Sequence, residues 1–352
     1  MNKWYGRLKR GGVAWRGAAA GMLGAIAALW AQGVAWALPS CPVYPALISK
    51  CCVANQPGQI YALNNDLSAP GECIDISAPN IYFLMNGKSL TGPGATGIGV
   101  HVLSTASNVI FSGQAPIQEF AVGFQTDAPN TLAYGVEAVL NGKGIVFNGP
   151  GAFAVQPVAE GSSRHGIVLT SAASGSFIWG AASGSNSMSG FLLNGVQGVT
   201  LRGPEAVENG TYGIWFKGAS FNTVIDGALE GNTLAGAYLG CNPAGPSVGC
   251  ATPPSNGNTL EGGDSLGLYV GSCPGNSQHN QPYGVAIDKG NVKNHVYAVK
   301  SDTNGSCVTP GDTLFDGYDG NPGAGCAGNF WLANSMTSEN HAWTLAHPTC
   351  MN

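Results

Sequence analysis

Charged side chains are scarce in this chain. Asp, Glu, Lys and Arg supply 9% of its 352 residues, where a globular domain usually has about 25%. The few cations form no basic stripe, which argues against nucleic-acid binding. The 54 Gly residues follow no G-X-Y period, which excludes collagen. Because 44% of the residues are hydrophobic, the chain is not expected to be disordered either.

Metal-binding motifs and helical patterns are also missing. No CxxC pair occurs and the six His residues are scattered, so no zinc site is predicted. No amphipathic run with a 3.6-residue period follows residue 37, so helices should be rare. Asp312, Asp316 and Asp319 lie in a Gly-rich loop, and carboxylates suit calcium. Their spacing differs from that of an EF-hand, so we expect a solvated loop and no required cofactor.

The first 37 residues read as a secretory signal peptide. Five cations occur before residue 17, and the uncharged stretch 17–37 ends in Ala35-Trp36-Ala37, a small-x-small cleavage pattern. A retained N-terminal anchor is the alternative, since the apolar run approaches spanning length. Cleavage would leave 9 Lys+Arg and 19 Asp+Glu, a formal net charge of −10. We therefore expect a soluble, acidic protein that is secreted, periplasmic or on the cell surface, without a membrane span.

All ten Cys residues follow the predicted cleavage point. An even number of Cys in an exported chain indicates disulfides, although the connectivity cannot be read from the sequence. Cys241 and Cys250 bracket a turn-rich loop that one bridge could close. Cys326 and Cys350 could hold the C-terminal tail.

A short apolar unit that begins with Gly recurs through the middle of the chain, and the first four copies are 24, 23 and 23 residues apart. Its copies begin at Gly166, Gly190, Gly213, Gly236, Gly267 and Gly284. A second apolar unit is interleaved with it, as in Val199-Thr-Leu-Arg-Gly and Asn222-Thr-Val-Ile-Asp-Gly. Each period therefore carries at least two short strands, separated by Gly, Asn and Ser.

These periods predict a coil of stacked parallel strands. One period cannot bury its apolar residues alone, whereas stacked periods fill a continuous interior. Gly and Asn suit the corners because they tolerate left-handed backbone conformations, and Asn side chains can also bond from turn to turn. An antiparallel sandwich or a propeller is the alternative, which the short, even period argues against. The predicted fold is a single-stranded, right-handed parallel β-helix of nine to ten coils.

The chain resembles the right-handed parallel β-helix superfamily, the pectate-lyase-like and NosD-like repeat proteins. The resemblance covers roughly residues 58–336. The stretches that carry it are Tyr61-Ala-Leu-Asn-Asn-Asp-Leu, Cys73-Ile-Asp-Ile-Ser-Ala-Pro-Asn-Ile, the repeat from Asn209 to Gly227, and Gly328-Asn-Phe-Trp-Leu-Ala-Asn. It implies the fold, but this fold hosts many activities.

Aligning the repeats places side chains in columns. Ile214 and Phe216 should point inward, and Trp215 and Lys217 outward. The predicted outward column is Val168, Leu192, Trp215, Tyr238 and Tyr269, and its neighbour is Thr170, Asn194, Lys217, Gly240, Gly271 and Asp288. Sugar rings stack on exposed aromatic side chains, so we predict carbohydrate binding by Trp215, Tyr238 and Tyr269. The alternative is that loops cover the column and the aromatics are only packed.

The second unit predicts a column of Ser112, Trp179, Arg202, Asp226 and Glu261. Arg202 and Asp226 would then lie one coil apart. A carboxylate there could act in glycoside hydrolysis. By resemblance to β-helix lyases, Arg202 or Lys217 could instead remove the proton next to a uronate carboxylate. The candidate catalytic residues are thus Arg202, Asp226 and Lys217, and the simpler alternative is a solvated ion-pair ladder.

The catalytic motifs of the related enzymes are missing from the sequence. Asn-Thr-Asp, Gly-His-Gly and Arg-Ile-Lys of polygalacturonases do not occur, and neither do Trp-Ile-Asp-His of pectate lyases or Asp-Pro-His of alginate epimerases. Ser163-Arg164-His165-Gly166 matches Gly-His-Gly only in part. These departures leave open whether the protein is an enzyme.

The sequence therefore predicts an exported β-helix protein, a monomer that recognises extracellular polysaccharide, with lyase or glycoside hydrolase activity if it is an enzyme. The alternative is a non-catalytic structural or adhesion protein of the cell surface or matrix. A metal-handling role has no Cys, His and Met cluster to support it. The expected segments are a signal peptide (1–37), an N-terminal cap (38–60), the β-helix (61–309) and a disulfide-linked closing segment (310–352).

Overall fold

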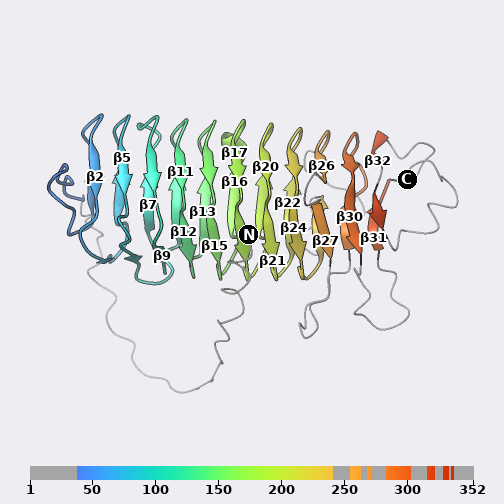
Figure 1. The fold of residues 1–352 in the computed structure, drawn as a ribbon, viewed down its shortest axis with the longest axis horizontal. Helices are drawn as coiled ribbons and strands as arrows, with labels where there is room; N and C mark the ends of the chain where they lie inside the picture. The colour runs from blue at the N-terminus through green and yellow to red at the C-terminus, as the bar shows by residue number, and fades with distance from the viewer. Residues whose placement is uncertain are drawn as a thin grey trace, which may run out of the picture. The chain divides into compact units, whose positions relative to one another are not determined.

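The computed structural model describes residues 38–240, 254–262, 268–271, 283–302, 315–321, 328–332 and 334–336. Their strands form three sheets of 11 strands each, and neighbouring strands in a sheet come from successive turns of one coil. The paired strands run parallel. Figure 1 shows the turns stacked in sequence order from β2 to β32. The predicted parallel coil is confirmed.

Each turn contributes one strand to each sheet. Sheet 1 consists of β1 (Cys52–Ala54), β4 (Ile74–Ile76), β7 (Ile98–Val102), β10 (Val122–Thr126), β13 (Lys143–Phe147), β16 (Ile167–Thr170), β19 (Phe191–Asn194), β22 (Tyr212–Lys217), β25 (Ala235–Leu239), β28 (Tyr283–Ile287) and β31 (Phe315–Asp319). Sheet 2 consists of β2 (Ile60–Ala62), β5 (Tyr82–Leu84), β8 (Ile110–Ser112), β11 (Leu132–Tyr134), β14 (Phe153–Val155), β17 (Phe177–Trp179), β20 (Thr200–Arg202), β23 (Thr223–Ile225), β26 (Thr259–Glu261), β29 (His295–Tyr297) and β32 (Phe330–Leu332).

Sheet 3 was missed by the repeat analysis. It consists of β3 (Leu67–Ser68), β6 (Leu90–Thr91), β9 (Pro116–Gln118), β12 (Glu137–Val139), β15 (Val158–Glu160), β18 (Ala182–Gly184), β21 (Glu205–Val207), β24 (Gly227–Glu230), β27 (Leu268–Gly271), β30 (Val299–Asp302) and β33 (Ser335–Met336). The inward residue of its central strands is small, as in Ala138, Ala159 and Ser183. These strands contain no run of large apolar residues, so the sequence pattern did not predict them. A 3-10 turn, η2 (Ser171–Ala173), follows β16.

Within the described residues the coil has eleven turns, more than the nine to ten expected. Its first strand, β1, lies inside the segment 38–60 that was expected to cap the coil. Most turns take 21–26 residues; Ile214, for example, pairs with Ala237. Ala237 pairs with Val285, 48 residues later. The additional residues of this long turn include 241–253 and 272–282, which lie outside the described residues.

The interior follows the predicted alternation. Ile214 and Phe216 are fully buried inside the coil. Aromatic rings also contact one another there between turns. The Phe83 and Phe111 rings stack with centroids 5.7 Å apart, and the Phe124 ring packs against Phe111 at a tilt, with centroids 5.0 Å apart. Burial of this stacked interior supplies the main stabilisation of the coil.

Asn side chains bond from turn to turn at two corners, as predicted. The Asn186 side-chain amide donates to Asn209, and the Asn209 amide donates to Asn232, both at 2.9 Å. A second ladder comprises Asn222, Asn258, Asn294 and Asn329. The first ladder explains why the repeat unit begins with Gly. A Cβ at Gly213 would lie 2.5 Å from the Gly236 carbonyl oxygen and 2.9 Å from Asn232 Nδ2.

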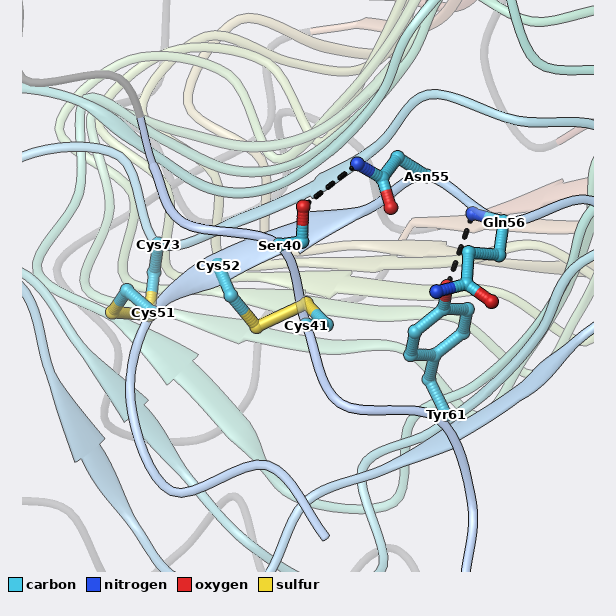
Figure 2. The surroundings of a disulfide bond; sticks show 8 residues. All are labelled: Ser40, Cys41, Cys51, Cys52, Asn55, Gln56, Tyr61 and Cys73. Atoms are coloured by element: carbon cyan, nitrogen blue, oxygen red, sulfur yellow. Dashed lines mark hydrogen bonds between the residues drawn. A yellow bond between two sulfur atoms is a disulfide. The ribbon is translucent and has the colours of Figure 1, made fainter. Parts of the chain in front are cut away.

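Two disulfides close the N-terminal end of the coil, Cys41–Cys52 and Cys51–Cys73 (Figure 2). They join the first turn both to the segment before it and to the second turn. Disulfides persist in oxidising compartments, so both bonds fit an exported protein. The other six Cys residues, including the predicted pairs Cys241–Cys250 and Cys326–Cys350, lie outside the described residues. In the part of the chain that the structure describes, no helix is long and apolar enough to span a membrane.

Candidate functional site

The predicted aromatic column is correct for part of its length. Leu192 pairs with Trp215, and Trp215 pairs with Tyr238, on the outer side of sheet 1. The next member is Ala286 and not Tyr269. Tyr269 belongs to β27 of sheet 3, where it pairs with Ala228. The units at Gly267 and Gly284 both resemble a sheet 1 strand in sequence, but of these two only the unit at Gly284 lies in sheet 1. Gly271 is therefore not in the predicted column with Lys217, because it pairs with Asp302 on sheet 3.

The expectation that this column is exposed is wrong for the residues whose burial is known. Trp215 is 3% exposed and Tyr238 is fully buried. The Trp215 indole donates a hydrogen bond to the Gly240 carbonyl, and the Tyr238 hydroxyl donates to Asp288. The ring centroids of Tyr212 and Tyr238 lie 4.4 Å apart. These aromatics pack as a second apolar cluster, separate from the interior.

The three predicted catalytic residues do not come together on one sheet. Arg202 is exposed on sheet 2, beside Trp179 of the preceding turn. Lys217 lies on sheet 1, with its ammonium 5.3 Å from the Trp215 ring centre. Asp226 falls outside the predicted column, because Ile225 occupies the place opposite Arg202.

The predicted pairing of Arg202 with Asp226 is therefore wrong. Asp226 is at a corner, with a left-handed φ of 57°. Within the described residues, Oδ1 of Asp226 is buried without a hydrogen-bond partner, and the one ion pair joins two other residues. Ser112, Trp179 and Glu261 do lie in the column predicted for them.

That ion pair, His101 with Asp127, marks a polar site that the sequence analysis missed. His101 Nε2 lies 2.8 Å from Asp127 Oδ2, on the outer side of sheet 1. Gln125 and Asn148 donate to the other oxygen of Asp127, at 2.9 and 3.0 Å. Both members of the pair keep a minor exposed fraction, 15% for His101 and 22% for Asp127.

The bonds around Asp127 fix its charge and the orientation of the imidazole. Burial alone would raise the pKa of Asp127, but the hydrogen bonds from His101, Asn148 and Gln125 outweigh burial and lower the pKa. An ionised Asp127 favours a proton on His101 Nε2. Among the described residues, the hydrogen bonds of the His101 ring are made through Nε2.

Asp75 lies one strand before His101 in the same column. Its Oδ1 atom is buried and has no hydrogen-bond partner among the described residues. Burial, and then repulsion from Glu72, raise the pKa of Asp75, while the nearby His101 lowers it less. The environments of Asp75 and Asp127 therefore push their pKa values apart, which is how acid and base roles are divided in enzymes.

A polar line continues from this group across sheet 1. Thr170 donates to Asn148, and Asn194 and then Lys217 follow Thr170 in register. The neighbouring column changes from polar to apolar over the same turns, and it consists of Asp75, His101, Gln125, Val146, Val168, Leu192, Trp215 and Tyr238. The sequence contains the signal, because a polar residue alternates with buried neighbours in Ile74-Asp75-Ile76 and Val100-His101-Val102. The Gly-initiated repeat begins too late to include it.

His165 is a second histidine on this side of the coil. It is 8% exposed and lies near Trp215, with ring centroids 6.2 Å apart. Burial, with repulsion from Lys143, Arg164 and Lys217, lowers the pKa of His165 to about 4. Its Nδ1 accepts a bond from the Ser189 backbone, so the neutral ring has a structural role.

The described residues include no group of three His, Cys, Asp or Glu side chains that could hold a metal. Asp312 lies outside the described residues, as does the side chain of Asp316. Asp319 is buried and accepts bonds from Asn321 and Asn329. The expected solvated loop is therefore wrong for Asp319, which ends β31 (Phe315–Asp319) and is buried.

No family model matches the chain, and neither does any curated protein. The structure is similar to that of the Dettilon tailspike protein gp208, with a TM-score of 0.55, 12% identity and coverage of 80% of this chain and 61% of the tailspike. The chain is a right-handed parallel β-helix. A double mutant of the periplasmic alginate epimerase AlgG is also similar to this β-helix, with a TM-score of 0.51, 12% identity and coverage of 81% and 78%. The β-helix thus spans about three fifths of the tailspike, and at this identity the similarity establishes the fold.

Proposed function

We propose that this exported protein binds an extracellular polysaccharide along the outer side of sheet 1 and modifies it by proton transfer at His101, Asp127 and Asp75. The observation that carries the proposal is the bonded His101–Asp127 pair with the unpartnered Asp75 oxygen one strand away. A linear polymer along the coil axis would meet these groups and the polar line beyond them. Lys217 lies five strands after His101 in sheet 1, which is about 24 Å along the coil at about 4.8 Å per strand.

His101 is the base in this proposal. Asp127 and its amide partners hold the ring in one orientation, and Nδ1 takes the substrate proton, as an oriented imidazole does in other acid–base sites. In a lyase reaction, the proton leaves the carbon next to a uronate carboxylate, and its electron pair forms the new carbon–carbon double bond as the glycosidic C–O bond breaks.

Asp75 is the acid in the same reaction. A raised pKa keeps a carboxyl group protonated to a higher pH, so Asp75 can give its proton to the leaving glycosidic oxygen. In a hydrolase reaction, Asp75 would protonate the same oxygen while His101 activates a water molecule. A lyase yields unsaturated sugars and a hydrolase yields saturated ones, so the products distinguish the two.

A non-catalytic rod is the second candidate function. Two observations favour it. The aromatic column predicted to bind sugar is buried at Trp215 and Tyr238, and the three catalytic residues predicted from the sequence are on separate parts of the coil. A rigid coil with a packed outer face would serve adhesion or matrix structure without chemistry.

A polysaccharide panel tests the proposal. The protein without residues 1–37 is incubated with alginate, polygalacturonate, xylan and a neutral glucan, and the products are followed by absorbance of unsaturated sugars and by new reducing ends. Asp75→Asn and His101→Ala should abolish turnover of the polysaccharide that the unchanged protein modifies. His295→Ala, at an exposed histidine on sheet 2, is the matched control. Binding without turnover of any polysaccharide would favour the rod.

A further inference from the structure

The outer side of sheet 2 carries an uncharged apolar stripe over six consecutive turns. Its first column runs along one edge of the strands, and the second runs along the other. The stripe comprises Ile60, Tyr82, Ile110, Leu132, Phe153 and Phe177 in the first column, and Ala62, Leu84, Ser112, Tyr134, Val155 and Trp179 in the second. Only Ser112 is polar. The charged positions of the second column, Arg202 and Glu261, come after the stripe.

Apart from Ala62, which is buried, the side chains of the stripe are exposed or half-buried, unlike the apolar column of sheet 1. Trp179 is 53% exposed, and Tyr82, Tyr134 and Phe153 are also among the exposed large side chains. The Phe153 and Phe177 rings stack 5.3 Å apart with nearly parallel planes. Contiguous exposed apolar surface of this kind usually marks an interaction site.

Exposed side-chain amides line both edges of the stripe. Asn80, Asn108 and Asn130 form a ladder at the corner before the first column, in which Asn108 donates to Asn80 at 3.3 Å and Asn130 donates to Asn108 at 3.5 Å. All three are exposed. They offer donors and acceptors without charge beside the flat apolar surface.

The opposite corner carries Asn86, Gln114 and Gln156, which are also exposed. Gln114 and Gln156 adopt a left-handed backbone, with φ of 67° and 51°, a conformation uncommon for Gln. The Gln114 side chain lies against Gly135 of the next turn, and Gln156 against Gly180. The Gly residues leave the amides room along the edge of the stripe.

The dimensions of the stripe argue against a folded protein partner. Six strands about 4.8 Å apart extend about 24 Å, and its two columns lie about 7 Å apart. This surface amounts to roughly 170 Å², whereas a stable interface buries about 800 Å² per partner. A single extended polymer chain matches such a long, narrow surface.

We infer that this stripe is an accessory binding surface for a linear, uncharged polysaccharide. The flat faces of neutral sugar rings would stack on Tyr82, Tyr134, Phe153 and Trp179, and their hydroxyl groups would bond to the amides of both edges. The absence of charge over the stripe disfavours uronate chains, whose carboxylates would lose water without gaining a cation. The surface is on a different sheet from the His101–Asp127 group, and its function does not depend on catalysis there.

Affinity electrophoresis through gels with hydroxyethyl cellulose, soluble xylan, dextran, alginate or polygalacturonate tests this inference. The protein should be retarded by at least one of the three neutral polymers. Trp179→Ala and Tyr134→Ala should each weaken that binding roughly tenfold, as removal of a stacked aromatic anchor does. Gln156→Ala should weaken it less. Tyr297→Ala is the matched control, since Tyr297 is similarly exposed on sheet 2 but lies beyond the stripe, next to Glu261.

Three results would overturn the inference: retardation by none of the neutral polymers, binding that Trp179→Ala leaves unchanged, or stripe-dependent self-association in analytical ultracentrifugation. Circular dichroism verifies that each variant is folded. His101→Ala should keep the binding to the neutral polymer, so failure of the proposed enzyme and failure of the stripe give different results.

Discussion

Two tryptophans on the outer side of the coil have opposite surroundings. Trp215 on sheet 1 and Trp179 on sheet 2 both alternate with buried neighbours, and both side chains face away from the interior. Trp215 is 3% exposed and Trp179 is 53% exposed. Period-2 alternation thus identifies the outer side of a sheet, whereas the packing on that side decides whether the residue is available to a ligand.

The difference separates two kinds of surface on one molecule. On sheet 1, aromatic side chains pack together, and the available side chains are the polar ones around His101 and Asp127. On sheet 2, the aromatics are exposed and flanked by amides. We therefore assign acid–base chemistry to sheet 1 and neutral-sugar stacking to sheet 2.

The largest expected effect follows from removal of the base on sheet 1. His101→Ala should lower polysaccharide turnover about 10²–10⁴-fold, the usual contribution of a general base. Turnover is measured by unsaturated products or reducing ends at saturating substrate. Equal rates for His101→Ala and the unchanged protein would show that His101 on sheet 1 is not the base.

Trp215→Ala should destabilise the coil by about 3–5 kcal/mol, since it removes a large buried side chain and leaves a cavity. The substitution also removes the indole bond to Gly240. Equilibrium unfolding in urea measures the change in free energy of unfolding. A loss below 1 kcal/mol would mean that Trp215 is not packed in solution.

The buried His165 on sheet 1 should make stability depend on pH. Its pKa is about 4 in the folded chain and about 6.5 when unfolded. The unfolded chain therefore takes up the proton first as pH falls, and stability is lost between pH 6.5 and 4, by about 3 kcal/mol at most. His165→Gln should flatten this part of the profile measured by urea unfolding at several pH values. His295→Gln, at an exposed position, should leave it unchanged.

The smallest effect belongs to sheet 2. Trp179→Ala should change the free energy of unfolding by no more than about 0.5 kcal/mol, because the side chain is exposed. The same unfolding measurement, made beside Trp215→Ala, compares the two tryptophans directly. A loss comparable to that of Trp215→Ala would show that the stripe is packed against another part of the chain.

The coil could be predicted from the sequence because stacking requires particular residue types, Gly and Asn, at the same place in successive turns. Gly at the start of the repeated sheet 1 strands, as at Gly190 and Gly213, and Asn at the corners are required by the close contacts and ladders described above. Sheet 3 was not predicted because the inward residues of its central strands are small. Tyr269 was misplaced because a strand that begins with Gly has a similar sequence on sheet 1 and on sheet 3.

The site was harder to predict than the fold. The Arg202–Asp226 alignment failed by one residue, since a corner residue took the place assigned to a strand residue. The His101–Asp127 contact joins residues 26 apart, more than the 23-residue repeat. Turn length varies along the coil, so side-chain partners across turns depend on a register that the repeat alone does not fix.

The central claim is that His101, held by Asp127 and adjacent to Asp75, performs proton transfer on a polysaccharide. The most direct measurement is turnover of the polysaccharide panel by the protein without residues 1–37, compared with His101→Ala, Asp75→Asn and the control His295→Ala. The account predicts that one polysaccharide is modified by the unchanged protein and by the control, but by neither site variant. Turnover that survives both site substitutions, or no turnover of any polysaccharide, would contradict it.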